Sequence, residues 1–153
     1  MSGLPFDFEG TPRKKLTLVE NGTAVELAHD RRTASKAGTD PTGHALPQPS
    51  PMGSMPSNLV LEPGQSSLDQ MIAETENGIL VTSFHYVNQL EPMNITLTGM
   101  TRNGTFKIEN GKLSHPIQNM RFTICLPNVF NNVEALSSDR IFVNAFFGGG
   151  SVV

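Results

Sequence analysis

Two Asn-Gly pairs, each set between short runs of alternating apolar and polar residues, constrain this chain more than any other feature. Asn21-Gly22 lies within residues 16–27, and Asn110-Gly111 lies within residues 105–114. Both residues of an Asn-Gly pair tolerate positive φ angles, so the pair closes a two-residue turn between antiparallel strands. The sequence therefore predicts two β-hairpins and favours antiparallel sheets.

Further strands and three short helices complete the predicted class. Strands are expected at residues 58–61, 78–86, 95–98, 121–125 and 140–146. Helices are expected at residues 30–37, where Asp30 caps the start and Gly38 ends the helix, at residues 67–77, and at residues 128–136. Ser67 and Gln70 form a predicted capping box, and apolar residues at helical spacing follow them. We therefore predict an α+β protein, mainly antiparallel β-sheets arranged like a sandwich or barrel, with about eight strands and two or three short helices.

The length of 153 residues predicts a single domain, with residues 39–57 as one long proline-rich loop. Five prolines in this stretch exclude a central strand or a long helix. Long loops inside compact domains are usually functional or disordered, which makes Thr42, Gly43 and His44 candidates for a functional role. The alternative is a plain turn, in which Gly43 allows a sharp bend and His44 faces solvent.

The charge distribution disfavours nucleic acid as a partner, and none is expected. The net charge is −3, and residues 39–101 carry six acids and no Lys or Arg. The basic run Arg13-Lys14-Lys15 has no aromatic residues between its charges, and it is interpreted as the flank of a strand. The apolar runs are shorter than the roughly 20 residues of a membrane span. The first residues resemble no signal peptide, so a cytoplasmic protein without membrane contact is expected.

No catalytic or metal-binding motif is evident among these residues. The four histidines, His29, His44, His85 and His115, lie more than ten residues apart, so no HExxH helix exists. A GxSxG nucleophile elbow is also missing. Cys125 could be a nucleophile, but its place in a predicted strand favours a small buried side chain instead. We assign no catalytic residue and no metal ligand.

Seven stretches of the chain carry a resemblance to a known family. They are PFDFEGTPRKKLTLVENG, DRRTASKAGTDPTGHA, NLVLEPGQSSLDQMI, NGILVTSFHYVN, LTGMTRNGTFKIENGKL, IQNMRFTICLPNVFNNVEAL and FFGGGSVV. In this order they resemble the C-terminal domain of the TldD/PmbA family, peptidase-related proteins that are also called modulators of DNA gyrase. The stretches cover nearly the whole chain, and the run GMTRNGTFKIENGKL followed by NMRFT is specific.

The resemblance implies a place in a larger, two-domain architecture. In the family, an N-terminal α/β domain carries an HExxxH helix that binds zinc, and the C-terminal domain of the metal-binding branch supplies a cysteine as third ligand. Such proteins cleave unfolded peptides and often pair as one metal-binding and one metal-free subunit. A role with DNA gyrase rests on the family's alternative name alone.

This chain departs from the metal-binding branch in two ways. Its 153 residues contain no HExxxH motif, and residues 142–146 stand where the family's ligand cysteine falls. The resemblance therefore implies the metal-free branch, with no cofactor in this chain and zinc only if a partner supplies it. The implied function is that of a non-catalytic C-terminal domain or subunit that binds an extended peptide or a metal-bearing partner subunit.

Strand edges offer such a domain a way to hold an extended peptide through backbone hydrogen bonds. The residues expected to line the groove belong to the basic helix and the following loop: Asp30, Arg31, Arg32, Thr42, Gly43 and His44. The partner is a peptide or a family subunit in a homo- or hetero-oligomer. An alternative is an assembly module that oligomerises through open β edges without any proteolytic role. An autonomous enzyme using Cys125 or His44 is disfavoured.

Overall fold

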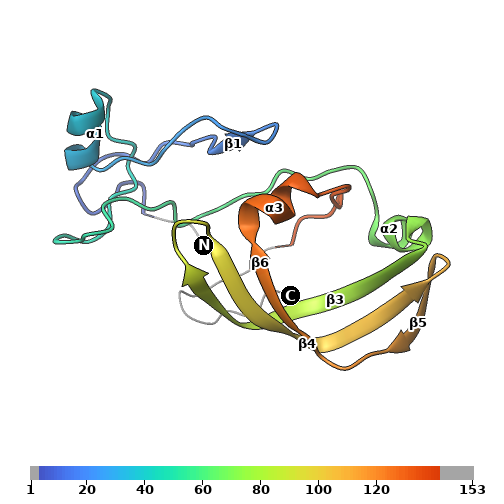
Figure 1. Ribbon diagram of the computed structural model, residues 1–153. Coiled ribbons are helices and arrows are strands. Elements are labelled where there is room, and N and C mark those ends of the chain that lie inside the picture. Colours follow the sequence, from blue (N-terminus) through green and yellow to red (C-terminus); the bar gives the residue numbers. More distant parts are fainter. Residues whose placement is uncertain (1–3, 142–153) are drawn as a thin grey trace. The chain divides into compact units, whose positions relative to one another are not determined.

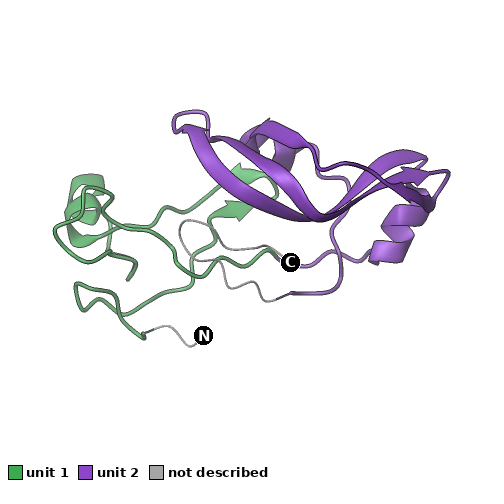
Figure 2. Ribbon diagram, turned by 90° about the horizontal axis from the view of Figure 1, so that it is seen from below, with its two compact units in different colours: residues 1–61 green, residues 62–153 purple. Residues whose placement is uncertain are grey.

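The computed structural model describes residues 4–141, and the chain divides into two compact units. Unit 1 takes in residues 1–61 and unit 2 takes in residues 62–153, drawn in green and purple in Figure 2. Each unit has its own architecture, and the single domain expected over residues 1–153 stays a prediction.

The first hairpin of unit 1 is confirmed, although it is much shorter than predicted. Strand β1 (Val19–Glu20) pairs antiparallel with β2 (Thr23–Ala24). The turn residues Asn21 and Gly22 have φ angles of 49° and 78°, as a two-residue turn of this kind requires. All four strand residues are exposed, so no buried face extends the pairing along the predicted run.

Helix α1 (Arg31–Ala37) has the predicted ends. The Asp30 side chain caps the first turn by accepting from the Thr33 N–H. The Thr33 hydroxyl oxygen accepts from the backbone N–H of Asp30, which completes a capping box. Gly38 has a φ of 67° and ends the helix in the left-handed conformation. These local interactions act within a few residues, which is why the sequence predicts them well.

Loops and polar contacts make up the rest of unit 1. Residues 39–57 contain no helix and no strand beyond an isolated bridge between Ala45 and Ser54, as the prolines predicted. Within residues 4–61, the fully buried apolar side chains are Ala34 and Ala45. Unit 1 is therefore held together largely by hydrogen bonds.

Unit 2 is built on an antiparallel sheet of four strands (Figure 1). These strands are β3 (Asn77–Glu91), β4 (Thr96–Glu109), β5 (Lys112–Pro116) and β6 (Arg121–Cys125). Strand β4 pairs with β3 on one side, and on its other side with β6 along its first part and β5 along its second. The predicted α+β class with antiparallel sheets is confirmed, and the described strands form an open sheet.

The second predicted hairpin connects β4 and β5. Glu109 pairs with Lys112, and Asn110 and Gly111 between them have φ angles of 49° and 75°. Their backbone N–H groups donate to the carbonyls of Glu76 and Thr75, so the turn also fixes the start of β3. This turn thus connects β4, β5 and the start of β3.

Two short helices flank the sheet. In α2 (Leu68–Glu74), Ser67 caps the backbone of Gln70, but the Gln70 side chain donates to Glu74 and leaves the predicted capping box half formed. No residue of α2 is fully buried. Helix α3 (Leu126–Asn131) begins directly after β6, because Pro127 suits the first helical turn, and it ends before the predicted boundary at residue 136.

Two predicted strands do not appear as expected. Residues 58–61 form no strand, since no neighbouring strand in residues 4–141 pairs with them. Of the strand expected at residues 140–146, Arg140 and Ile141 are not in a strand, and Arg140 forms an ion pair with Glu62. Residues 142–146 lie outside the described part. The described residues contain six strands rather than about eight, with three short helices.

Candidate functional site

The six residues predicted to bind a peptide divide into two groups, and Asp30 belongs to the internal one. Its side chain is 2% exposed, and its Oδ1 accepts bonds of 2.6 Å from both the backbone N–H and the hydroxyl of Thr33. These bonds from Thr33 lower the pKa of Asp30 below its usual value despite burial. The carboxylate therefore serves the helix start.

Thr42 and Gly43 join the proline-rich loop to two other segments of unit 1. The Thr42 hydroxyl oxygen accepts from the backbone N–H of His29 at 2.9 Å, and the Thr42 N–H donates to the His29 carbonyl at 3.0 Å. Gly43 has a φ of 78°, and a Cβ built there would lie 2.2 Å from the carbonyl oxygen of Pro12. Only glycine permits this approach.

His44 and Asp7 form further hydrogen-bond contacts in this part of unit 1. His44 Nδ1 lies 3.1 Å from the Thr42 hydroxyl oxygen, and the side chain is half-buried. Asp7, which is 3% exposed, accepts bonds of 2.9 Å from the backbone N–H groups of Glu9, Thr11 and Ala45. Sequence reasoning missed Asp7, although an aspartate directly before a turn, where its side chain can accept from the backbone two residues on, is a recognised signal for this kind of loop.

The remaining two predicted residues, Arg31 and Arg32, have exposed side chains on α1. The backbone N–H of Arg31 donates to the Glu9 carboxylate at 2.9 Å. Arg32 lines a surface hollow of about 530 Å³ together with Glu9, Asp30 and residues 48–51. Of the six predicted residues, the structure therefore brings Asp30 and Arg32 to a common hollow. Thr42, Gly43 and His44 instead form contacts within unit 1. Peptide binding by the set stays a prediction.

The environment of His44 makes the stability of unit 1 depend on pH. Burial and the positive charge of Arg13 lower the pKa of His44 below its usual 6.5, while Thr42 and Asp7 act in the opposite direction. The unfolded chain therefore binds a proton before the folded chain does, and stability falls as the pH drops through 6.5 towards the lowered value. We expect wild type to lose more unfolding free energy than His44→Gln between about pH 7.5 and about pH 5.5 in urea titrations.

The matched control for this prediction is His115→Gln, because His115 is exposed in β5 and its substitution leaves the His44 contact intact. That variant is expected to keep the wild-type pH dependence. Equal slopes for His44→Gln and wild type would show that His44 takes up its proton equally well in the folded and unfolded states.

A second candidate site lies at the edges of the unit 2 sheet, and the three described edges differ. The register of β3 shifts at three places along its pairing with β4, and such bulges protect an edge. Strand β5 carries Lys112 and Pro116, which protect it by charge and by a missing N–H. Strand β6 pairs with β4 in unbroken register over five residue pairs, and after Arg121 it has no charged residue. Among the described edges, β6 is therefore the one open to strand addition.

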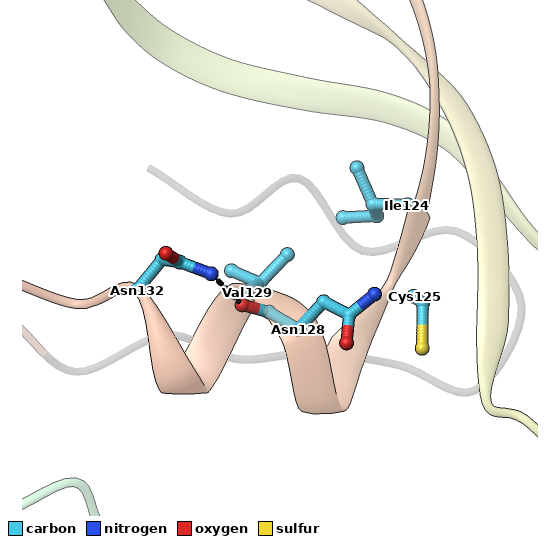
Figure 3. Close-up of a pocket in the computed structure, with 5 residues that line it drawn as sticks. All are labelled: Ile124, Cys125, Asn128, Val129 and Asn132. Atoms are coloured by element: carbon cyan, nitrogen blue, oxygen red, sulfur yellow. Dashed lines mark hydrogen bonds between the residues drawn. The ribbon is translucent and has the colours of Figure 1, made fainter.

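A pocket of about 440 Å³ adjoins this open edge where β6 passes into α3. Ile124 and Cys125 of β6 and Asn128, Val129 and Asn132 of the α3 region line it. Figure 3 shows Ile124 and Val129 on one side of the strand–helix junction and the Asn128 amide reaching towards Cys125. We call it the β6–α3 pocket. It is a shallow, open hollow, and no charged group lines it.

Hydrogen bonds fix two of the polar groups in the β6–α3 pocket. The Asn132 side chain donates to the Asn128 carbonyl at 2.7 Å, and Cys125 Sγ donates to the Asn94 carbonyl at 3.3 Å. In the described part of the chain, no hydrogen bond involves the Asn128 side-chain amide. That amide is thus available to donate to and accept from a ligand. The sequence signal for the pocket is the pair of asparagines four residues apart.

The described residues do not fit a zinc site. Residues 4–141 bring together no group of three or more His, Cys, Asp or Glu side chains that could hold a metal ion. The Cys125 thiol donates to a carbonyl instead. Residues 142–146, where the resemblance places the ligand cysteine of the metal-binding branch, lie outside the described part. No helix in residues 4–141 is both long enough and apolar enough to span a bilayer.

Comparison with known proteins identifies the family. The family model of the PmbA/TldA metallopeptidase C-terminal domain matches residues 1–153. A metalloprotease of Methanothermobacter thermautotrophicus is 28% identical over 138 residues, which cover 88% of this chain and 29% of the relative.

Two solved structures share the fold. A Bacteroides thetaiotaomicron protein named for modulation of DNA gyrase is 32% identical, with a TM-score of 0.69 over 89% of this chain and 28% of its own. TldE from Thermococcus kodakarensis, at 23% identity, has a TM-score of 0.71 over 95% of this chain and 33% of its own. The chain thus spans about a third or less of the length of these proteins. It belongs to the PmbA/TldD family and corresponds to the C-terminal domain of that family.

Proposed function

We propose that this chain acts as a non-catalytic C-terminal domain or subunit of a TldD/PmbA-type peptidase and holds an extended peptide for proteolysis. The observation that carries the proposal is the open edge of β6 beside the β6–α3 pocket. Strand addition of this kind combines main-chain hydrogen bonds for affinity with a side-chain pocket for specificity.

The chemistry of the β6–α3 pocket selects the peptide. Ile124 and Val129 offer apolar walls, and no charged side chain lines the pocket, so an aliphatic peptide side chain fits there and a charged one would lose its hydration. The Asn128 amide has both a donor and an acceptor to offer to the peptide backbone. The expected ligand is thus an extended peptide with an aliphatic residue at the position that enters the pocket.

Catalysis in this proposal belongs to a metal-bearing partner subunit or domain. The relatives that the chain matches are named metalloproteases, and one structural neighbour is named TldE, which supports a link to peptidases of this family. When bound by such a partner, zinc would supply the activated water for peptide hydrolysis. The contribution of residues 4–141 is to hold the peptide backbone extended.

The test is a binding measurement with a defined probe. A fluorescein-labelled peptide Thr-Val-Leu-Val-Thr is titrated with the chain, and its anisotropy is followed. We expect Val129→Glu to weaken binding at least about tenfold, because it places a charge in an apolar pocket. The matched control is Val133→Glu: Val133 is 46% exposed against 40% for Val129 and does not line the pocket.

The same variants are then mixed with a metal-bearing TldD-type subunit, and co-elution and peptide cleavage are measured. Wild type and Val133→Glu should raise cleavage of the probe, and Val129→Glu should not. A peptide with proline at its centre, which cannot complete the pairing, should bind weakly to all three. Absence of binding by wild type, or equal losses in both variants, would refute the proposal.

A further inference from the structure

The chain contains four Asn-Gly pairs, and their backbone surroundings differ. In such a pair the glycine nitrogen can attack the asparagine side chain, because glycine has no Cβ to obstruct the approach and its backbone turns freely. Three pairs, Asn77-Gly78, Asn103-Gly104 and Asn110-Gly111, lie in β3, in β4 or in the turn between β4 and β5. The fourth, Asn21-Gly22, forms the turn of the β1–β2 hairpin. The fold therefore decides which pair can react.

The hairpin around Asn21-Gly22 holds its turn weakly. Strands β1 and β2 pair at two positions, and one further backbone bond joins the Val25 N–H to the Leu18 carbonyl. All four strand residues are exposed. A two-stranded hairpin without a buried face is marginally stable, so this turn opens at little cost in free energy. In the described part of the chain, no backbone hydrogen bond involves the Gly22 N–H, the group that would attack.

The turn at Asn110-Gly111 is fixed from outside its own hairpin. The Asn110 N–H donates to the Glu76 carbonyl at 2.7 Å, and the Gly111 N–H donates to the Thr75 carbonyl at 3.0 Å. Figure 1 shows this turn beside α2, and a Cβ built on Gly111 would lie 2.5 Å from the Ala73 carbonyl oxygen. The φ angles of the two turns are nearly equal, so a difference in reactivity arises from these surroundings.

The remaining two pairs are held by the pairing of β3 with β4. Asn77-Gly78 pairs with the end of β4, and Asn103-Gly104 lies between two positions at which β4 pairs with β3. The Lys107 ammonium donates to the Asn77 side-chain oxygen, and the Thr82 hydroxyl donates to the Gly104 carbonyl at 2.9 Å. Reaction at either pair requires part of the four-stranded sheet to open, which costs more than opening the β1–β2 hairpin.

We propose that Asn21 is a site of spontaneous deamidation and isoaspartate formation in the folded chain, whereas Asn77, Asn103 and Asn110 are protected. The Gly22 nitrogen gives its proton to solvent and forms a bond to Asn21 Cγ. The bond from Cγ to Nδ2 breaks, and that nitrogen takes a proton from solvent and leaves as ammonia. Water then opens the resulting succinimide: cleavage at Cγ gives aspartate, and cleavage at the backbone carbonyl carbon gives isoaspartate.

Either product changes the β1–β2 hairpin. Residue 21 gains a negative charge beside Glu20, and the net charge of the chain goes from −3 to −4. Isoaspartate also adds one carbon to the backbone of a two-residue turn, so β1 and β2 no longer meet in their register. The reaction uses neither the edge of β6 nor the β6–α3 pocket, so its test is independent of the proposed function.

The test follows all four pairs in the same sample of the full chain. The chain is kept in mildly alkaline buffer and digested, and mass spectrometry gives the deamidated fraction of each Asn-Gly peptide. Asn21 should react within about threefold of the rate in the free peptide Val-Glu-Asn-Gly-Thr-Ala. Asn110 should react at least about tenfold more slowly than in the free peptide Ile-Glu-Asn-Gly-Lys-Leu, because two backbone bonds must break first.

Matched variants and urea separate the effect of the fold from that of the local sequence. Asn21→Gln should abolish most of the isoaspartate that a protein isoaspartate methyltransferase detects, together with the acidic shift on anion exchange, and Asn110→Gln should leave both unchanged. In urea, Asn21 and Asn110 should both approach the rates of their free peptides. Equal rates at the two sites in the folded chain, an Asn21 as slow as Asn110, or a difference that persists in urea would each overturn the inference.

Discussion

Asp7→Ala is expected to destabilise unit 1 by about 3–5 kcal/mol, which is a large part of the stability of a small domain. The Asp7 carboxylate accepts three backbone N–H bonds, from Glu9, Thr11 and Ala45, all at 2.9 Å. Alanine leaves these donors without their partner, and each buried unsatisfied donor costs about 1–3 kcal/mol. The bond to Ala45 spans 38 residues, so its loss also separates the N-terminal loop from the proline-rich loop.

Two substitutions control this expectation. Asp7→Asn keeps one acceptor oxygen and the shape of the side chain, but its NH₂ group faces a backbone donor, so we expect an intermediate loss of about 1–3 kcal/mol. Asp40→Ala removes an exposed aspartate from the same unit and should change stability by less than about 0.5 kcal/mol. Urea unfolding gives the free energies, and amide exchange at Thr11 and Ala45 localises the effect. A loss for Asp7→Ala no larger than that for Asp40→Ala would contradict the assigned role.

The pKa of the Asp7 carboxyl group determines how the stability of unit 1 changes in acid. Burial alone would raise the pKa of Asp7. The three N–H donors and the positive charge of Arg13 together lower it by more, so the pKa of Asp7 lies below the usual 3.8. The pKa of Asp30 is lowered as well, by Thr33. Groups with a lowered folded pKa stabilise the fold above their unfolded pKa and lose that contribution as the pH falls through the folded value. Both carboxylates therefore act below the pH range in which His44 acts.

Local features of the fold could be predicted from the sequence because their causes lie within a few residues. The Asn21-Gly22 and Asn110-Gly111 turns and the two ends of α1 are determined by backbone freedom and short-range capping bonds. The start of α3 was predicted two residues late, because the periodicity of its apolar side chains was followed rather than the preference of Pro127 for a first turn.

Features that depend on contacts distant in sequence could not be predicted in this way. Residues 58–61 have a strand-like composition, yet a strand requires a neighbour, and none in the described chain pairs with them. The role of Asp7 depends on a bond to Ala45, and no local pattern shows that these two loops meet. The β6–α3 pocket exists only because α3 follows β6 without a loop, which brings Ile124 and Val129 together.

The six predicted site residues also show that roles which depend on distant contacts cannot be predicted from a local sequence pattern. Thr42, Gly43 and His44 were selected because a long loop often carries function, and the structure gives each of them a contact within unit 1. A glycine and a histidine in a proline-rich loop have the same sequence pattern whether they bind a ligand or hold the loop in place. The distance to the backbone of Pro12 distinguishes these roles for Gly43, and that distance is a property of the fold alone.

Gly38→Ala provides the reference for the second large effect in unit 1. Gly38 has a φ of 67°, and a Cβ built there meets nothing within 4 Å. Its substitution therefore isolates the cost of placing alanine in the left-handed region, about 1 kcal/mol. Gly43 has a similar φ of 78° but lies against the backbone of Pro12 and Arg13. The difference in unfolding free energy between Gly43→Ala and Gly38→Ala therefore measures the cost of the close approach of residue 43 to the backbone of Pro12 and Arg13.

Gly43→Ala is expected to destabilise unit 1 by about 3–5 kcal/mol, the sum of the left-handed strain and of overpacking against a neighbouring chain segment. The new Cβ would lie 2.2 Å from the Pro12 carbonyl oxygen and 2.6 Å from the Arg13 Cα, which are backbone atoms that no rotamer change can move. Relief requires the two segments to separate, and this breaks the bond from the Lys14 N–H to the Thr42 carbonyl. Urea unfolding of Gly43→Ala and Gly38→Ala side by side measures the effect, with amide exchange at Lys14 as the local readout. Equal losses in the two variants would mean that the loop carrying Thr42 and His44 is not held against Pro12 in solution.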